Sequence, residues 1–169
     1  MGEGAAITVD PWSHLVWIFH PTDSGFRPER LSPKTRKVVE SSSIEDISGS
    51  LAEPFVQTRS AVFIAPGIVA LLVRDERSPR QPDPQFRSDF PRIFLVQVHL
   101  ILSDLRTGRS VRLSSLWSRG GMDESDQQPN HLAAIPALSL IAVEWESTLR
   151  IYDCSDALRR LAASATSTQ

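Results

Sequence analysis

Residues 94–113, FLVQVHLILSDLRTGRSVRL, decide the fold of this chain. In the first half of the stretch every even position is apolar, whereas the odd positions mix apolar and polar residues. This period of two predicts a β-strand with one buried face. Asp104 and Gly108 then supply a turn, because aspartate can hydrogen-bond its own backbone and glycine can take a positive φ. Apolar residues alternate again at Val111 and Leu113, so the stretch is predicted to form a β-hairpin.

Parts of this pattern return around three prolines, Pro11, Pro66 and Pro136. Placing the prolines in register aligns the segments ITVDPWSHLVWIF (7–19), AVFIAPGIVALLV (61–73) and HLAAIPALSLIAV (131–143). Each segment has an apolar residue two positions before the proline and a strongly apolar strand after it. Further along, LSDL matches IYDC, which places Asp104 opposite Asp153. Internal similarity of this kind indicates a repeated structural unit.

Repeats of about 40–50 residues with four short strands are typical of β-propeller blades. We therefore predict an all-β protein, a partial β-propeller of about three antiparallel blades with long polar loops. The single domain covers residues 1–163, with blade-like units at about 5–56, 57–116 and 130–156 and a disordered tail at 164–169. A short C-terminal helix is predicted at 157–163, capped by Ser155 or Asp156. The alternative is a single β-sandwich or barrel, which needs no repeat.

Three polar stretches separate the apolar segments. Residues 20–37 carry a cluster of basic side chains, and a solvated loop is predicted there rather than a site for an acidic partner. Residues 74–92 contain four prolines and charges of both signs, which predicts a mobile insertion within one hairpin. Residues 114–130 are predicted to form a third polar connection.

Composition excludes several classes of function. The net charge is −2, so neither nucleic acid nor an anionic membrane surface is expected as a partner. No apolar run approaches the roughly 20 residues of a membrane helix, and the N-terminal residues lack the pattern of a signal peptide. Cys154 is the only cysteine, which rules out an intrachain disulfide and favours a reducing, intracellular compartment, cytoplasmic or nuclear.

The sequence shows no recognisable catalytic, cofactor or metal site. The histidines have no metal-ligand spacing, and His99 falls in the polar register of its strand, which predicts a surface or interface position. Cys154 has no histidine near it in sequence and is predicted to be a small buried thiol. Glu144 and Glu146 flank Trp145 on one face of a strand, and paired carboxylates can perform acid–base catalysis. At a strand end beside a turn, however, such a pair is more often solvated.

Short motifs resemble the propeller-like region of fungal F-box proteins. These are VDP at 9–11, LVWI at 15–18 and LRTG at the end of the central strand, at 105–108. The family often shows a VDP…DLLVL strand and a later HLRSLSTG hairpin, with an aspartate where this chain has His14. The F-box itself, a helical segment rich in proline and leucine, is not found in these 169 residues. The resemblance implies a partial propeller separated from its adaptor-binding part.

Two hypotheses of different class follow. The first is a non-enzymatic protein-interaction module that binds a protein partner or missing propeller blades, as the substrate-recognition part of an F-box-like protein. Trp12 and Trp17 are candidate anchors of such a surface, although Trp17 lies in an apolar run and is predicted to be core. The alternative is a hydrolase-type enzyme on a β-scaffold that uses Glu144 or Glu146. We favour the first, with no catalytic residue, no cofactor and no metal.

Overall fold

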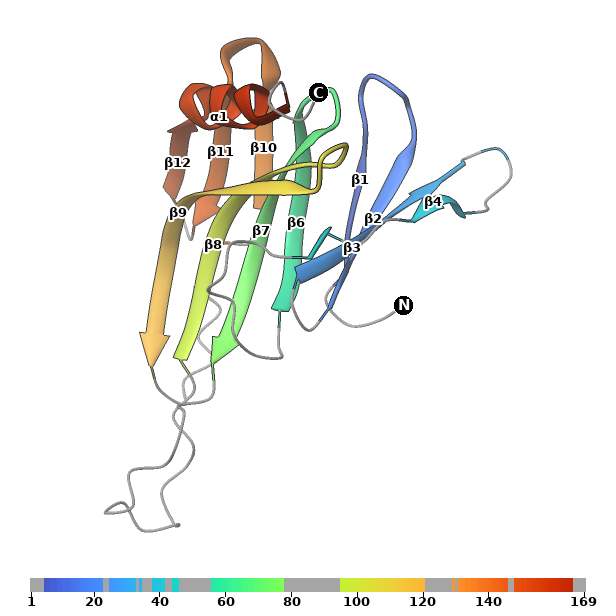
Figure 1. Cartoon of the computed structure of the whole chain (residues 1–169). Helices are drawn as coiled ribbons and strands as arrows, with labels where there is room; N and C mark the ends of the chain where they lie inside the picture. The colour runs from blue at the N-terminus through green and yellow to red at the C-terminus, as the bar shows by residue number, and fades with distance from the viewer. Residues whose placement is uncertain are drawn as a thin grey trace.

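The described part of the chain forms three antiparallel sheets and one α-helix in a computed structural model (Figure 1). The structure describes residues 5–22, 25–32, 34, 38–41, 44–45, 56–77, 95–120, 129, 131–145 and 148–165. The predicted all-β class is confirmed within these residues. Three separate sheets are present, in place of the two sheets of a sandwich or the single closed sheet of a barrel.

Each sheet runs through its strands in the order of the sequence. The first sheet contains β1 (Ala6–Val9), β2 (Val16–Pro21), β3 (Gly25–Leu31) and β4 (Val38–Ser41), with the short β5 (Ile44–Glu45) also paired to β3. The middle sheet contains β6 (Val56–Ala65), β7 (Ile68–Arg77), β8 (Leu95–Asp104) and β9 (Arg109–Gly120). The third sheet contains β10 (His131–Ile135), β11 (Leu140–Trp145) and β12 (Thr148–Asp153), with a single 3₁₀ turn η1 (Pro136–Leu138) after β10.

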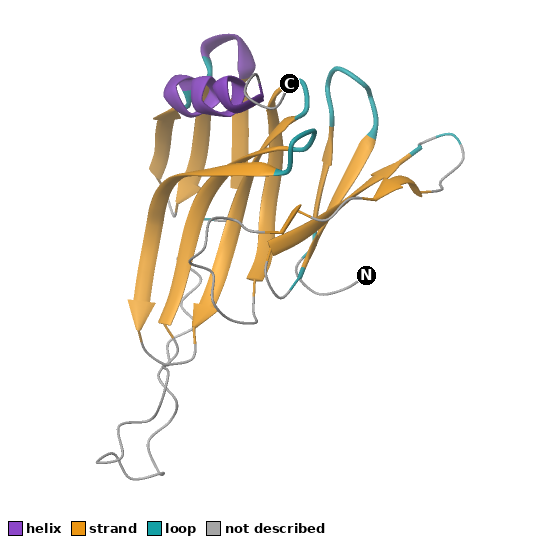
Figure 2. Cartoon of the chain, in the orientation of Figure 1, coloured by secondary structure: helices purple, strands orange, loops and turns teal. Residues whose placement is uncertain are grey.

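The middle sheet is covered on both faces, because its strands are apolar on both sides. On β7, Val69 and Leu71 pack with Trp17 and Phe19 of the first sheet. The alternate residues of β7 pack instead against the third sheet and α1 (Ser155–Ala165), in a core that contains Leu72, Leu100, Leu102, Ile141, Val143 and Leu161. We call the face of the middle sheet toward the third sheet its front face, and the face toward the first sheet its back face. Figure 2 shows α1 lying across one end of the third sheet.

The three prolines used to align the sequence occupy the same place in each sheet. Pro11, Pro66 and Pro136 each lie in the connection between the first and second strands. Each connection contains a residue with a positive φ: Gly67 (73°) and Ser139 (54°) directly precede the second strand, and His14 (57°) lies two residues before β2. In the middle sheet the carbonyl of Gly67 accepts a hydrogen bond from the N–H of Leu105 at 2.9 Å. In the third sheet the carbonyl of Ser139 accepts the equivalent hydrogen bond from the N–H of Cys154 at 2.8 Å.

The central hairpin is confirmed, but its histidine is not at the surface. β8 and β9 pair antiparallel around the turn, and Val98, Leu100 and Leu102 are fully buried. His99 points to the opposite face, as the alternation requires, yet it is only 1% exposed. The prediction of a surface or interface histidine is therefore wrong, because the first sheet covers the back face, which the strand pattern could not reveal.

Several predicted loop boundaries also need correction. The basic stretch at 20–37 contains β3, in which Arg30 lies over the ring of Trp17 at 5.9 Å. β7 continues to Arg77 and β9 to Gly120, so the polar stretches begin later than expected, because strand pairing extends into polar residues. The remainder of the predicted insertion, residues 78–92, lies outside the described residues.

The C-terminal helix is longer than predicted and is capped differently. It begins at Ser155 and runs to Ala165, into the predicted tail, and the rest of the tail lies outside the described residues. Ser155 is already helical, so neither Ser155 nor Asp156 precedes the helix as a cap. Instead the carboxylate of Asp153 accepts a hydrogen bond from the Ser155 backbone N–H at 2.8 Å.

Candidate interaction surface

The outward face of the third sheet is equivalent, residue by residue, to the buried front face of the middle sheet. The register establishes this, because the first residue of the second strand pairs with the last aspartate of the third strand in both sheets: Ile68 with Asp104, and Leu140 with Asp153. Leu102 and Leu100 lie two and four residues before Asp104 on β8. Ile151 and Leu149 lie two and four residues before Asp153 on β12, so they occupy the equivalent positions.

Equivalent positions differ completely in exposure. Leu100 and Leu102 are 0% exposed, whereas Leu149 is 64% and Ile151 is 58% exposed. Ile135 and Leu138, at the β10 end of the same sheet, are also exposed. We call Ile135, Leu149 and Ile151 the open front face. Nothing in the described chain covers it.

The first sheet has a second uncovered apolar face. Ile7 and Val9 are both 55% exposed, and they pair across strands with Ile18 and Val16, which are half-buried. We call these four residues the open back face. Its polar border is an ion-pair cluster in which Glu29 lies 3.1 Å from His20 and 3.2 Å from Arg27.

Glu144, one of the two predicted carboxylates, lies at the border of the open front face. Glu144 is exposed and pairs in register with His131. Both line an open depression of about 330 Å³ together with Leu132, Ala133, Ala142, Thr148 and Leu149. Glu146 lies outside the described residues.

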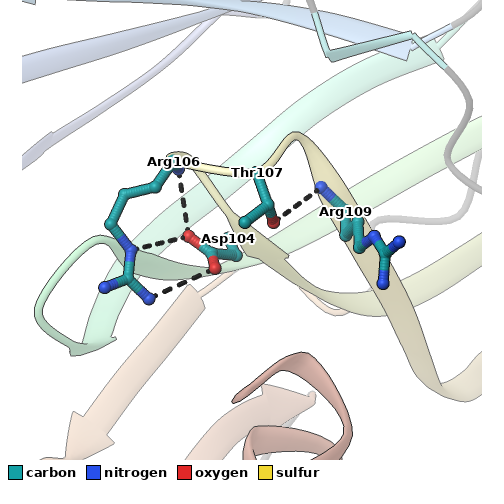
Figure 3. A network of polar contacts seen from close by, with 4 residues as sticks. All are labelled: Asp104, Arg106, Thr107 and Arg109. Carbon is teal, nitrogen blue, oxygen red and sulfur yellow. Dashed lines mark hydrogen bonds and ion pairs between the residues drawn. The ribbon is translucent and has the colours of Figure 1, made fainter. Parts of the chain in front are cut away.

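Among the residues that the structure describes, the most enclosed charged group is Asp104, at the end of β8 (Figure 3). Its carboxylate is fully buried and accepts hydrogen bonds from the Arg106 backbone N–H at 3.0 Å and from the guanidinium at 3.1 and 3.2 Å. Burial raises the pKa of Asp104, but the bonds from Arg106 lower it more, so the pKa lies below its usual value of 3.8. Because Arg106 itself is largely exposed and the aspartate is satisfied within its own turn, this group fixes the hairpin and has no free oxygen directed at a ligand.

Two further aspartates close turns in the same way. Asp153 is exposed, and the bonds from Ser155 lower its pKa. Asp10 is buried in the connection after β1, where its carboxylate accepts bonds from the Trp12 N–H at 3.0 Å and the Ser13 hydroxyl at 2.5 Å. All three carboxylates therefore bond the backbone two residues ahead, a local structural role that aspartate commonly has in turns.

The remaining candidate residues are dispersed. His99 bonds the Ser115 hydroxyl at 3.0 Å, and His20 contacts Glu29 in the first sheet. Cys154 is buried, as predicted, and burial together with the charge of Asp153 raises the pKa of its thiol to about 11. Across the described chain, no three histidine, cysteine, aspartate or glutamate side chains gather into a metal-binding group.

The two tryptophans proposed as anchors occupy different environments. Trp17 is buried between the first and middle sheets, where it packs against Phe19 and Phe63, as its apolar run predicts. Trp12 lies exposed in the connection after β1. The structure therefore does not bring them together in one surface. Among the helical residues that the structure describes, no segment has the length and apolar character needed to span a bilayer.

Comparison of the chain with protein-family models, with curated proteins and with solved structures gives no match. The arrangement of side chains is therefore the basis for assigning a function. Its dominant features are the two open apolar faces, which sequence analysis identified only as strands.

Proposed function

We propose that this chain is a non-enzymatic protein-interaction module whose three sheets are successive blades of a partial β-propeller. Propeller blades are antiparallel sheets arranged around an axis, with their faces packed on neighbouring blades. Three features of the chain support this arrangement. Apart from the short β5, the strands of each sheet pair in sequence order. Each sheet has a proline after its first strand, and β6 lies beside both β1 and β10, the first strands of its neighbours (Figure 1).

The observation that carries the functional proposal is the exposure of the open front face. A single exposed apolar side chain is ordinary on a protein surface, whereas a contiguous apolar patch marks an interaction site. Here Leu149 and Ile151 lie on one sheet face and are more than half exposed, at positions that another sheet covers in the middle sheet. A partner that covers them would remove this apolar area from water, as the third sheet does for Leu100 and Leu102.

The same geometry argues for binding rather than catalysis. Catalytic groups usually lie in concave pockets that enclose most of the substrate. Glu144 instead lies exposed in an open depression. We therefore do not propose the hydrolase. The resemblance to fungal F-box proteins extends the proposal: the chain would be the substrate-recognition part of an F-box-like protein.

The test compares three baits in extracts of cells that express the chain. The first is the wild type. The second carries Leu149→Lys and Ile151→Lys, and the control carries the same two charges on exposed residues of α1, Ala162→Lys and Ala163→Lys. We expect proteins that are retained by the wild type and the control and lost from the Leu149→Lys/Ile151→Lys bait. Identical retention by all three baits, or no retained protein, would contradict an interaction role for this face.

A further inference from the structure

The two open faces are the two halves of one type of contact. Both internal contacts of the chain are front-to-back: the front face of the middle sheet packs on the third sheet, and its back face packs on the first sheet. The side chains that the third sheet turns inward, such as Ile141, correspond in register to Val69 on the back face of the middle sheet. The third sheet thus offers a back face inward and leaves its front face open.

The first sheet is oriented in the same sense. The backbone N–H of Asp10 bonds the carbonyl of Leu15, so Asp10 and Leu15 close the connection as Ile135 and Leu140 do in the third sheet. It follows that Trp17 is equivalent to Ala142, on the front face. Trp17 and Phe19 pack against the middle sheet, so the first sheet presents its front face inward and leaves a back face open.

We infer that the open front face of one copy of this chain packs on the open back face of a second copy, and that two copies close a ring of six sheets. The inference rests on the proposed blade arrangement. A front-to-back contact is heterologous, and such contacts either close into a ring or continue into an open chain. Propellers close with about four to eight blades, so two copies of three sheets fit, whereas three copies would exceed that number.

The polar borders of the two faces are compatible with this contact. By the same register, Glu144 on the front face is equivalent to Phe19, the residue before His20. On the back face of the first sheet, Arg27 lies at the same position along the strands, because it pairs in register with His20. The Arg27 side chain contacts Glu29 and is 51% exposed. Front-to-back packing therefore places an exposed carboxylate at the level of an exposed guanidinium, around an apolar centre. This is the usual layout of a protein interface.

The experiment measures the mass of the purified full chain by light scattering and analytical ultracentrifugation. We expect the wild type at twice the 18.8 kDa of one chain. Ile151→Lys alters only the open front face and Val9→Glu only the open back face, so each variant alone should be monomeric. An equimolar mixture should regain the dimer, because one contact between the two variants is intact. Ala162→Lys, on the exposed side of α1, should remain dimeric.

Three results would overturn the inference. A monomeric wild type would show that a second copy does not cover these faces. In that case the interaction role would stand without the dimer if the Leu149→Lys/Ile151→Lys bait fails to retain proteins that the wild type retains. Dissociation by only one of the two variants would indicate a face that pairs with itself. A mass that grows steadily with concentration would indicate an open chain. Circular dichroism checks folding, and Ile151→Ser with Val9→Ser replaces any variant that fails to fold.

Discussion

The middle and third sheets have the same strand and turn pattern, but within the described residues only the middle sheet has another sheet packed on its front face. In both, a proline follows the first strand, the last residue of that connection has a positive φ, and an aspartate ends the third strand. Their front faces are apolar at equivalent positions, yet Leu100 is 0% exposed and Leu149 is 64% exposed. The difference shows that the strand sequence creates an apolar face, whereas the neighbouring sheet decides whether that face is core or surface.

The largest expected effect is a difference in stability between alanine variants of Leu100 and Leu149. Leu100→Ala leaves a cavity between the middle and third sheets and should lower the free energy of unfolding by about 2–5 kcal/mol. Leu149→Ala removes a side chain that is already in water and should change it by less than about 0.5 kcal/mol. Chemical denaturation of both variants at low protein concentration measures the difference. Similar losses for the two variants would show that Leu149 is covered in solution.

A second comparison concerns the aspartates at the ends of β8 and β12. Asp104→Asn weakens a buried, charge-assisted hydrogen-bond cluster and should cost about 1–3 kcal/mol. Asp153→Asn, in an exposed turn, should leave the unfolding midpoint nearly unchanged. If Asp153→Asn is the more damaging change, the cap of α1 matters more than the buried cluster.

The Asp104 effect should depend on pH in a defined direction. Its pKa in the folded chain is below the usual 3.8, so its ionised form stabilises the fold. That contribution is fully present above the unfolded value and is lost as the pH falls through the folded pKa. The difference between wild type and Asp104→Asn should therefore be constant near neutral pH and shrink below about pH 3.8. A difference that grows on acidification would contradict this assignment.

The smallest effect concerns the connections after the first strands. Gly67 has a φ of 73°, and a Cβ there would lie 3.3 Å from the Arg106 side chain, so Gly67→Ala should destabilise by about 1–2 kcal/mol. Ser139 has a φ of 54° with a Cβ already present. Ser139→Gly relieves that strain but adds freedom to the unfolded chain, so it should change stability by less than about 1 kcal/mol. Thermal unfolding of both variants tests the pair, and a neutral Gly67→Ala would show that the connection can rearrange.

The sequence by itself determined the apolar strands, the hairpin at Asp104 and the place of the three prolines between two strands. These follow from local rules: alternation specifies a strand face, and proline, glycine and aspartate specify turns. Alternation also placed the side chains of Val98 and Leu100 inward, and the usual burial of a free cysteine predicted the buried thiol of Cys154. The alternation of Leu149 and Ile151 also indicates an apolar strand face, but it does not indicate whether another layer covers that face.

Only the tertiary structure decided which faces are covered. His99 is buried, although a polar residue on a strand is expected at the surface. Leu149 is exposed, although an apolar residue in an alternating strand is expected to be buried. Arg30 likewise lies in a strand over Trp17, within a stretch whose composition predicts a loop. The physical reason is common to all three: burial depends on contacts between sheets distant in sequence, and a strand's own residues do not specify which layer packs on it.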